Sequence, residues 1–158
     1  SKSFTVHEWE VINQSAGGLK VRRSGQIDTP LTVGEVIGIK FIAKPRWQVG
    51  VIRWVSMAED GGVEFGVQML SPHAHAVLVR PTVGNINTNR PREALWLPEI
   101  VAANQPERLL TPLNLFSDLR EYEVSSLHRA FLVRATNLTE RTSRFEMFEF
   151  QHSEAAVA

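Results

Sequence analysis

The run that decides the fold is Val63-Glu64-Phe65-Gly66-Val67-Gln68-Met69, in which apolar residues alternate strictly with other residues. This period of two predicts a β-strand with one buried face. The preceding Glu59-Asp60-Gly61-Gly62 predicts a tight turn, because glycine accepts a positive φ without steric cost. The apolar segment 47–55 comes before that turn, so together these segments predict a β-hairpin.

Segment 47–55 is apolar on both of its predicted faces. Regular alternation puts Trp47, Val49, Val51 and Val55 on one face, with Arg53 among them, and Ile52 and Trp54 on the other. A strand that is apolar on both faces is usually covered on both sides. The second half of the chain offers a cover, because short aliphatic and aromatic runs recur in it at 76–79, 94–97, 109–116, 130–135 and 145–150.

These patterns predict an all-β protein with two modules. We expect an antiparallel β-barrel in residues 1–84, and an additional C-terminal β module in residues 85–158 that packs on the barrel. The turn formers of segment 84–91 predict a loop or linker between the two modules. A helix is possible at 98–104, and residues 153–158 are expected to form a frayed tail.

Composition excludes several classes of function. The 158 residues hold 17 basic and 17 acidic side chains, so no net charge draws the chain toward long nucleic acid. The absence of cysteine excludes disulfides and thiol catalysis, and it fits a cytoplasmic location. No run approaches eighteen apolar residues, so we expect no membrane-spanning segment.

The segment Asn13-Gln14-Ser15-Ala16-Gly17-Gly18 contains the pattern [D/N]-x-S-x-x-G. With the strands predicted after it, this pattern resembles the signature of PilZ domains over about residues 5–72. PilZ domains are small β-barrels that bind the bacterial second messenger cyclic di-GMP. The resemblance implies a regulatory domain in which Asn13 and Ser15 bond the polar edge of a guanine and Gly18 lets the ligand approach. The alternative is an ordinary loop whose Asn and Ser bond their own backbone.

PilZ domains that bind this ligand normally carry R-x-x-x-R before the first strand, and residues 1–12 contain no arginine. Either such arginines precede Ser1, or this copy is degenerate. Arg22 and Arg23 are candidate replacements, because a guanidinium donates two parallel hydrogen bonds to a phosphate or a guanine. Alternation after Leu19 points Arg22 outward, although a solvated surface arginine would follow the same pattern. We interpret Arg53 as a side chain that extends along apolar surface to water.

The remaining candidates are weaker. His73 and His75 have a spacing that could serve a metal, but no third ligand stands nearby in sequence, so exposed turn histidines are the better interpretation. None of the common catalytic motifs occurs, and we expect neither an enzyme nor a cofactor. The expected partners are cyclic di-GMP and an unidentified protein that receives the signal. The alternative is a degenerate PilZ-like module that binds protein and no nucleotide.

Overall fold

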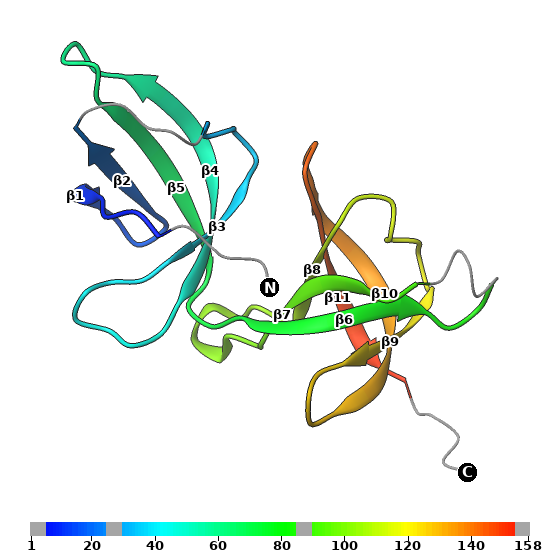
Figure 1. The fold of residues 1–158 in the computed structure, drawn as a ribbon. Coiled ribbons are helices and arrows are strands. Elements are labelled where there is room, and N and C mark those ends of the chain that lie inside the picture. Colours follow the sequence, from blue (N-terminus) through cyan, green and yellow to red (C-terminus); the bar gives the residue numbers. More distant parts are fainter. Residues whose placement is uncertain (1–5, 25–29, 85–89, 154–158) are drawn as a thin grey trace. The chain divides into compact units, whose positions relative to one another are not determined.

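The computed structural model describes residues 6–24, 30–84 and 90–153, which fall into two compact units, Ser1–Pro72 and His73–Ala158 (Figure 1). The predicted all-β class is confirmed. Within the described residues, the elements are strands apart from one short 3₁₀ helix, η1 (Val101–Ala103), which lies inside the segment where a helix was considered.

The first unit, for which a barrel was predicted, is an open five-stranded antiparallel sheet with the strand order β1-β2-β5-β4-β3. Its strands are β1 (Glu10–Gln14), β2 (Gly18–Arg23), β3 (Val36–Ile39), β4 (Gln48–Met57) and β5 (Val63–Ser71). Within the described residues its edge strands β1 and β3 do not pair with each other, and the closed barrel is in the second unit. The predicted hairpin is β4 and β5. The Ala58 N–H donates to the Gly62 carbonyl at 2.7 Å, and Gly61 has the positive φ of 81° that favours glycine in this turn.

One face of this sheet carries the core of the first unit. On β2, Leu19 and Val21 are buried while the residues between and after them are partly exposed, as alternation predicted. These two side chains pack with buried residues of β4 and β5, namely Ile52, Phe65 and Val67. On the opposite face, which we call the polar face, Lys20 and Arg22 of β2 pair with Gly66 and Glu64 of β5.

The second unit is a closed barrel with the strand order β10-β11-β8-β7-β6-β9. Its strands are β6 (His75–Pro81), β7 (Arg92–Leu97), β8 (Arg108–Thr111), β9 (Glu121–Ser125), β10 (Ala130–Arg141) and β11 (Glu146–His152). Because β6 pairs with β7 and β9, residues 75–81 belong to this unit, whereas the sequence placed the domain boundary after residue 84. Residues 85–89 of the predicted linker and 154–158 of the predicted tail lie outside the described residues. Packing of one module on the other stays a prediction.

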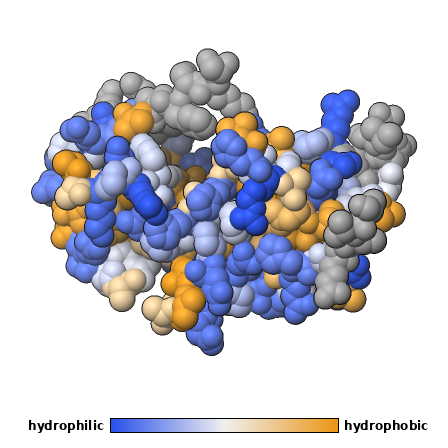
Figure 2. Space-filling view, turned by 90° about the horizontal axis from the view of Figure 1, so that it is seen from below, coloured by the Kyte–Doolittle hydropathy of each residue, from blue (hydrophilic) through white to orange (hydrophobic). Residues whose placement is uncertain are grey.

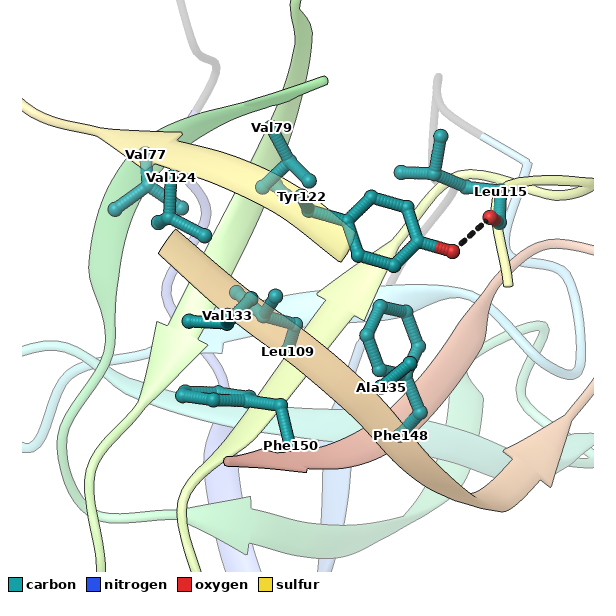
Figure 3. Close-up of a cluster of buried hydrophobic side chains, with 11 residues drawn as sticks. Val77, Val79, Leu109, Leu115, Tyr122, Val124, Val133, Ala135, Phe148 and Phe150 are labelled. Carbon is teal, nitrogen blue, oxygen red and sulfur yellow. Dashed lines mark hydrogen bonds between the residues drawn. The ribbon is translucent and has the colours of Figure 1, made fainter. Parts of the chain in front are cut away.

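The interior of the barrel is filled from all of its strands (Figure 3). Tyr122 and Phe148 are fully buried, and their ring centroids lie 5.6 Å apart. The Tyr122 hydroxyl donates to the Leu115 carbonyl and accepts the Ser117 N–H, so this buried polar group is satisfied. Burial raises the pKa of Tyr122, which keeps the hydroxyl a donor.

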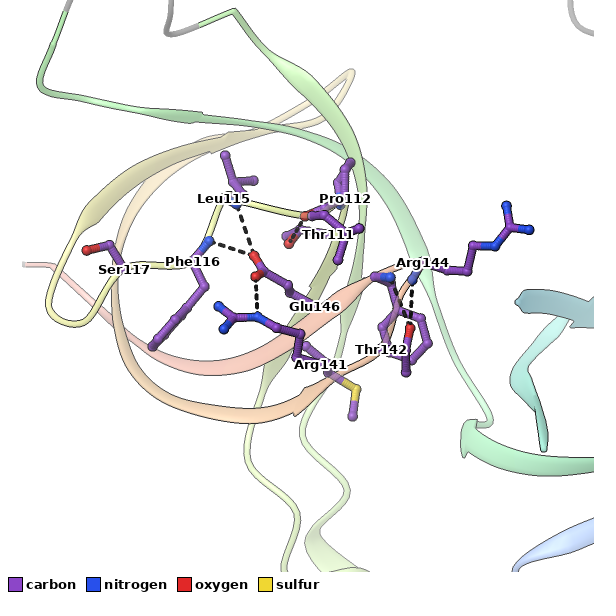
Figure 4. A network of polar contacts seen from close by, with 12 residues as sticks. Thr111, Pro112, Leu115, Phe116, Ser117, Arg141, Thr142, Arg144 and Glu146 are labelled. Atoms are coloured by element: carbon purple, nitrogen blue, oxygen red, sulfur yellow. Dashed lines mark hydrogen bonds and ion pairs between the residues drawn. The ribbon is translucent and has the colours of Figure 1, made fainter. Parts of the chain in front are cut away.

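The connection from β8 to β9 is held by a buried carboxylate (Figure 4). One oxygen of Glu146 accepts the backbone N–H groups of Leu115 at 3.0 Å and Phe116 at 2.9 Å. The other oxygen pairs with Nε of Arg141 at 2.7 Å. Burial alone would raise the pKa of Glu146, but these three donors hold it below its ordinary value. A single charged side chain thus fixes a long loop to the barrel.

Candidate functional site

The polar face of the first unit contains an open hollow of about 350 Å³, which is within the size range of small-molecule sites. Its floor is formed by β2 and β5, and its rims come from the β1–β2 hairpin and from β4. The lining residues are Asn13, Ser15, Gly17, Gly18, Leu19, Lys20, Arg53, Trp54, Gly66, Val67 and Gln68. Three residues singled out in the sequence, Asn13, Ser15 and Gly18, therefore lie around one cavity.

The hairpin that carries these three residues is shaped by backbone contacts. The Ser15 N–H donates to the Gly18 carbonyl at 3.0 Å, which closes the turn between β1 and β2. A Cβ at position 18 would lie 2.6 Å from the carbonyl oxygen of Val67 on the neighbouring strand. That oxygen belongs to the backbone and cannot move aside, so position 18 requires glycine for packing alone. A role of Gly18 toward a ligand stays a prediction.

The cross-strand register places a row of four residues across the floor of the hollow. Asn13 of β1 pairs with Lys20 of β2, Lys20 pairs with Gly66 of β5, and Gly66 pairs with Trp54 of β4. A Cβ at position 66 would overlap Nε1 and Cε2 of the Trp54 indole. The indole therefore occupies the space that a side chain at position 66 would fill, and 40% of Trp54 is exposed.

Two β-bulges frame this row, one in β1 between Val11 and Asn13 and one in β4 between Ile52 and Trp54. The bulge in β4 corrects the predicted faces of segment 47–55. Ile52 faces the core opposite Val67, but Arg53 is the extra residue, so Trp54 turns to the polar face instead of following Ile52 inward. Bulges are frequent beside functional sites because they redirect side chains. Arg53 and Trp54 consequently line the same hollow.

The hollow offers distinct kinds of contact. Two cations line it: the Lys20 ammonium lies 3.5 Å from a carboxylate oxygen of Glu64 and 6.0 Å from the centroid of the Trp54 ring, and the Arg53 Nε donates to Gln68 at 2.7 Å. The amide of Asn13 and the hydroxyl of Ser15 can each donate and accept hydrogen bonds. The exposed indole face of Trp54 can stack on a planar ring. These groups suit a ligand that combines an aromatic base with anionic groups.

Arg22 and Arg23 do not line this hollow. Arg22 pairs with Asp60 of the β4–β5 turn at 2.5 Å, and Arg23 contacts the ring of His7 at 2.6 Å. The backbone N–H of Gly62 and the charge of Arg22 hold the pKa of Asp60 below its ordinary value. The part of Arg22 and Arg23 in ligand binding stays a prediction. The sequence did not single out Lys20, Trp54 and Gln68, which also line the hollow. Arg53 was interpreted as a side chain that extends to water on the face opposite Trp54, and it lines the same hollow as Trp54.

The remaining expectations concern metals and membranes. In the described segments, no three His, Asp or Glu residues gather as metal ligands would, and the ring of His75 instead contacts Trp96 at a centroid distance of 5.2 Å. Nor do the helices of these segments include one with the length and apolar character needed to cross a bilayer.

Comparison with known proteins divides the chain near the same place as the structure does. Residues 1–76 match the family model described as "Cyclic-di-GMP receptor FimW, middle PilZ domain", and residues 77–153 match the model described as "FimW C-terminal beta-barrel domain". The chain is 27% identical over 161 aligned positions to the cyclic-di-GMP receptor FimW of Pseudomonas aeruginosa, covering 98% of this chain and 25% of that protein. No solved structure matches the chain. The resemblance to PilZ domains predicted over residues 5–72 is thereby confirmed.

Proposed function

This chain belongs to the FimW family, as a middle PilZ domain followed by the C-terminal β-barrel domain, and on that premise we propose that it is a receptor for cyclic di-GMP. Its relative carries that function in its name, and this chain spans about a quarter of the relative's length. The proposal is a receptor that binds the nucleotide without catalysing a reaction. It includes a cytoplasmic location, which the absence of cysteine from the sequence fits.

The observation that carries the proposal is the convergence of the motif residues with two cations around one hollow. Asn13 and Ser15 come from the β1–β2 hairpin, while Lys20 and Arg53 come from two strands within the sheet. An Asn amide and a Ser hydroxyl complement the donors and acceptors on a guanine edge. Charge-assisted hydrogen bonds from Lys and Arg are the contacts that bind phosphates most strongly.

In the proposed complex, a guanine stacks on the exposed face of Trp54 while its edge bonds Asn13 and Ser15. Lys20 and Arg53 are close enough to the indole to receive the phosphates of the same ligand. A ligand that contacts β1 and β4 together bridges the two rims of the hollow. The ligand therefore stabilises the conformation in which both rims contact it, and the population of that conformation rises when the ligand binds. A partner protein that recognises this conformation receives the signal.

Calorimetric titration with cyclic di-GMP tests the proposal, using two pairs of matched variants. Ser15→Ala is expected to weaken binding by about tenfold, the effect of one lost hydrogen bond to a desolvated partner. Asn13→Ala is expected to do the same. Ser126→Ala and Asn137→Ala remove the same groups from exposed positions of the second unit and should leave the affinity unchanged.

The titration also separates the proposal from its alternative. GTP serves as the competing ligand, because it has the same base but not the cyclic dinucleotide. Equal affinity for both ligands would contradict a specific receptor. No heat of binding from cyclic di-GMP with a folded chain would contradict the receptor altogether, and it would favour a PilZ-like module that binds only protein.

A further inference from the structure

The loop between β3 and β4 carries a feature that the nucleotide site does not use. It comprises residues 40–47 and is the cyan loop that extends from the first unit in Figure 1. The Lys44 N–H donates to the Phe41 carbonyl at 3.0 Å, which closes a tight turn with Ile42 and Ala43 at its centre. Turn centres usually hold Gly, Pro, Asn, Asp or Ser. Turn geometry therefore gives no reason for an isoleucine at this position.

The apolar residues of this loop are turned toward water. Ile42 is fully exposed and Trp47 is 49% exposed. Scattered hydrophobic residues are ordinary on protein surfaces, and the face drawn in Figure 2 shows them dispersed among hydrophilic ones. In loop 40–47 the exposed aliphatic residue is at the tip of a turn, and an exposed tryptophan follows within six residues.

The two ends of the loop are anchored, so its tip is held away from the sheet. Phe41 packs against the core of the first unit. The Trp47 ring lies against β3, where a Cβ at position 38 would be 3.2 Å from Cε3 of the indole. With both ends fixed in this way, the exposure of Ile42 is a property of the fold and is not caused by a loose segment.

The charged side chains of this loop are all basic. Lys40, Lys44 and Arg46 lie within the loop, and no acidic residue occurs between positions 36 and 58. The Lys44 ammonium lies 5.9 Å from the centroid of the Phe41 ring, beside the apolar tip. Although the whole chain has no net charge, electrostatic attraction at a surface acts over a Debye length of about 8 Å. A negatively charged surface that meets the loop is therefore attracted by three cations.

We propose that loop 40–47 docks this chain on an anionic lipid surface. Ile42 enters the boundary between headgroups and acyl chains, Trp47 lies at headgroup level, and Lys40, Lys44 and Arg46 contact lipid phosphates. The small apolar area favours lipid over protein, because a stable protein interface needs a contiguous patch of several hundred Å². One loop provides weak, reversible attachment.

Co-sedimentation of the full chain with phosphatidylcholine vesicles, with and without phosphatidylglycerol, tests this proposal. The wild type should bind the vesicles that contain phosphatidylglycerol, and high salt should weaken this binding. Ile42→Asp should lower the partition coefficient by about tenfold or more, because a buried aliphatic group is replaced by a charge that the lipid repels. Lys40→Gln with Lys44→Gln should also lower it by about tenfold or more.

Matched controls lie in the second unit. Leu127→Asp makes the same kind of change at an equally exposed position, and Arg134→Gln with Arg144→Gln removes two cations from exposed sites. Both variants should bind vesicles as the wild type does. Quenching of tryptophan fluorescence by brominated lipid should disappear in Trp47→Phe and persist in Trp9→Phe.

Three results would overturn the proposal. The first is no binding to either kind of vesicle by a chain whose circular dichroism shows it folded. The second is equal binding by the wild type and Ile42→Asp. The third is an equal loss in the loop variants and the second-unit controls, which would show general adsorption of a charged protein. If instead an acidic peptide binds loop 40–47 while vesicles do not, the loop is a protein-docking site and the lipid proposal fails.

Discussion

Substitution of Gly66 by alanine should remove the aromatic surface of the proposed nucleotide site without unfolding the first unit. A Cβ at this position would overlap the indole of Trp54, and the three atoms nearest to it all belong to that side chain. Trp54 is 40% exposed and can swing into water, so the stability change should stay within about 1 kcal/mol. Stacking of a base on an aromatic ring contributes about 1–3 kcal/mol, so cyclic di-GMP should bind about five- to 150-fold more weakly.

The assay is a double-mutant cycle measured by calorimetry. Gly66→Ala and Trp54→Ala each remove the same indole from the hollow, so the double variant should bind no more weakly than Trp54→Ala alone. Gly17→Ala is the matched control, because it lines the same hollow and a Cβ there meets nothing within 4 Å. Independent, additive losses from the two substitutions would show that Gly66 does not act by positioning the indole. Wild-type affinity in Trp54→Ala would refute the stacking role itself.

Two further predictions concern the second unit. Glu146→Gln should lower the free energy of unfolding by about 2 kcal/mol and the melting temperature of this unit by about 8–16 °C. The substitution replaces the charged acceptor of the Leu115 and Phe116 N–H groups by a neutral one, and it presents an amide donor to Arg141 in place of an acceptor. Because the fold lowers the pKa of Glu146, the stability that this carboxylate contributes is present above the ordinary glutamate pKa and is lost as the pH falls through the lowered value. Calorimetry should therefore find that the difference in unfolding free energy between the wild type and Glu146→Gln shrinks in acid. A difference that does not change with pH would contradict this cause. A fragment of residues 1–91 should aggregate more than a fragment of residues 1–72. The longer fragment contains β6 without its partners β7 and β9, so Val77 and Val79 become exposed. Equal light scattering by the two fragments would contradict this prediction.

Local patterns predicted the parts of the fold that obey a regular period. The alternation of Val63–Met69 and the glycines before it correctly predicted the β4–β5 hairpin, and alternation after Leu19 correctly predicted the buried face of β2. Strand β9 was overlooked because only Tyr122 and Val124 are apolar in it, and acidic residues stand beside both. Its burial depends on closure of the barrel, which is a property of all six strands together.

The candidate site was predictable only where it is local in sequence. Asn13, Ser15 and Gly18 stand in one short motif, and the structure brings all three to one hollow. Lys20 and Trp54 are 34 positions apart and meet only through the register of β2, β5 and β4. That register includes a bulge, and alternation could not locate it because segment 47–55 is apolar on both of its predicted faces.

The bulge at Arg53 determines which side chains of β4 line the hollow, so a change in the length of this strand would change the lining. In a regular strand, two consecutive residues point to opposite faces, so an aromatic ring and a cation on one face must stand at least two positions apart. One additional residue in β4 brings Arg53 and Trp54 to the same cavity at once. Deletion of the Arg53 codon would restore regular alternation between Ile52 and Trp54, so it would remove one cation from the cavity and keep the indole there. The length of one strand therefore sets the lining of the proposed nucleotide site independently of the motif residues Asn13, Ser15 and Gly18.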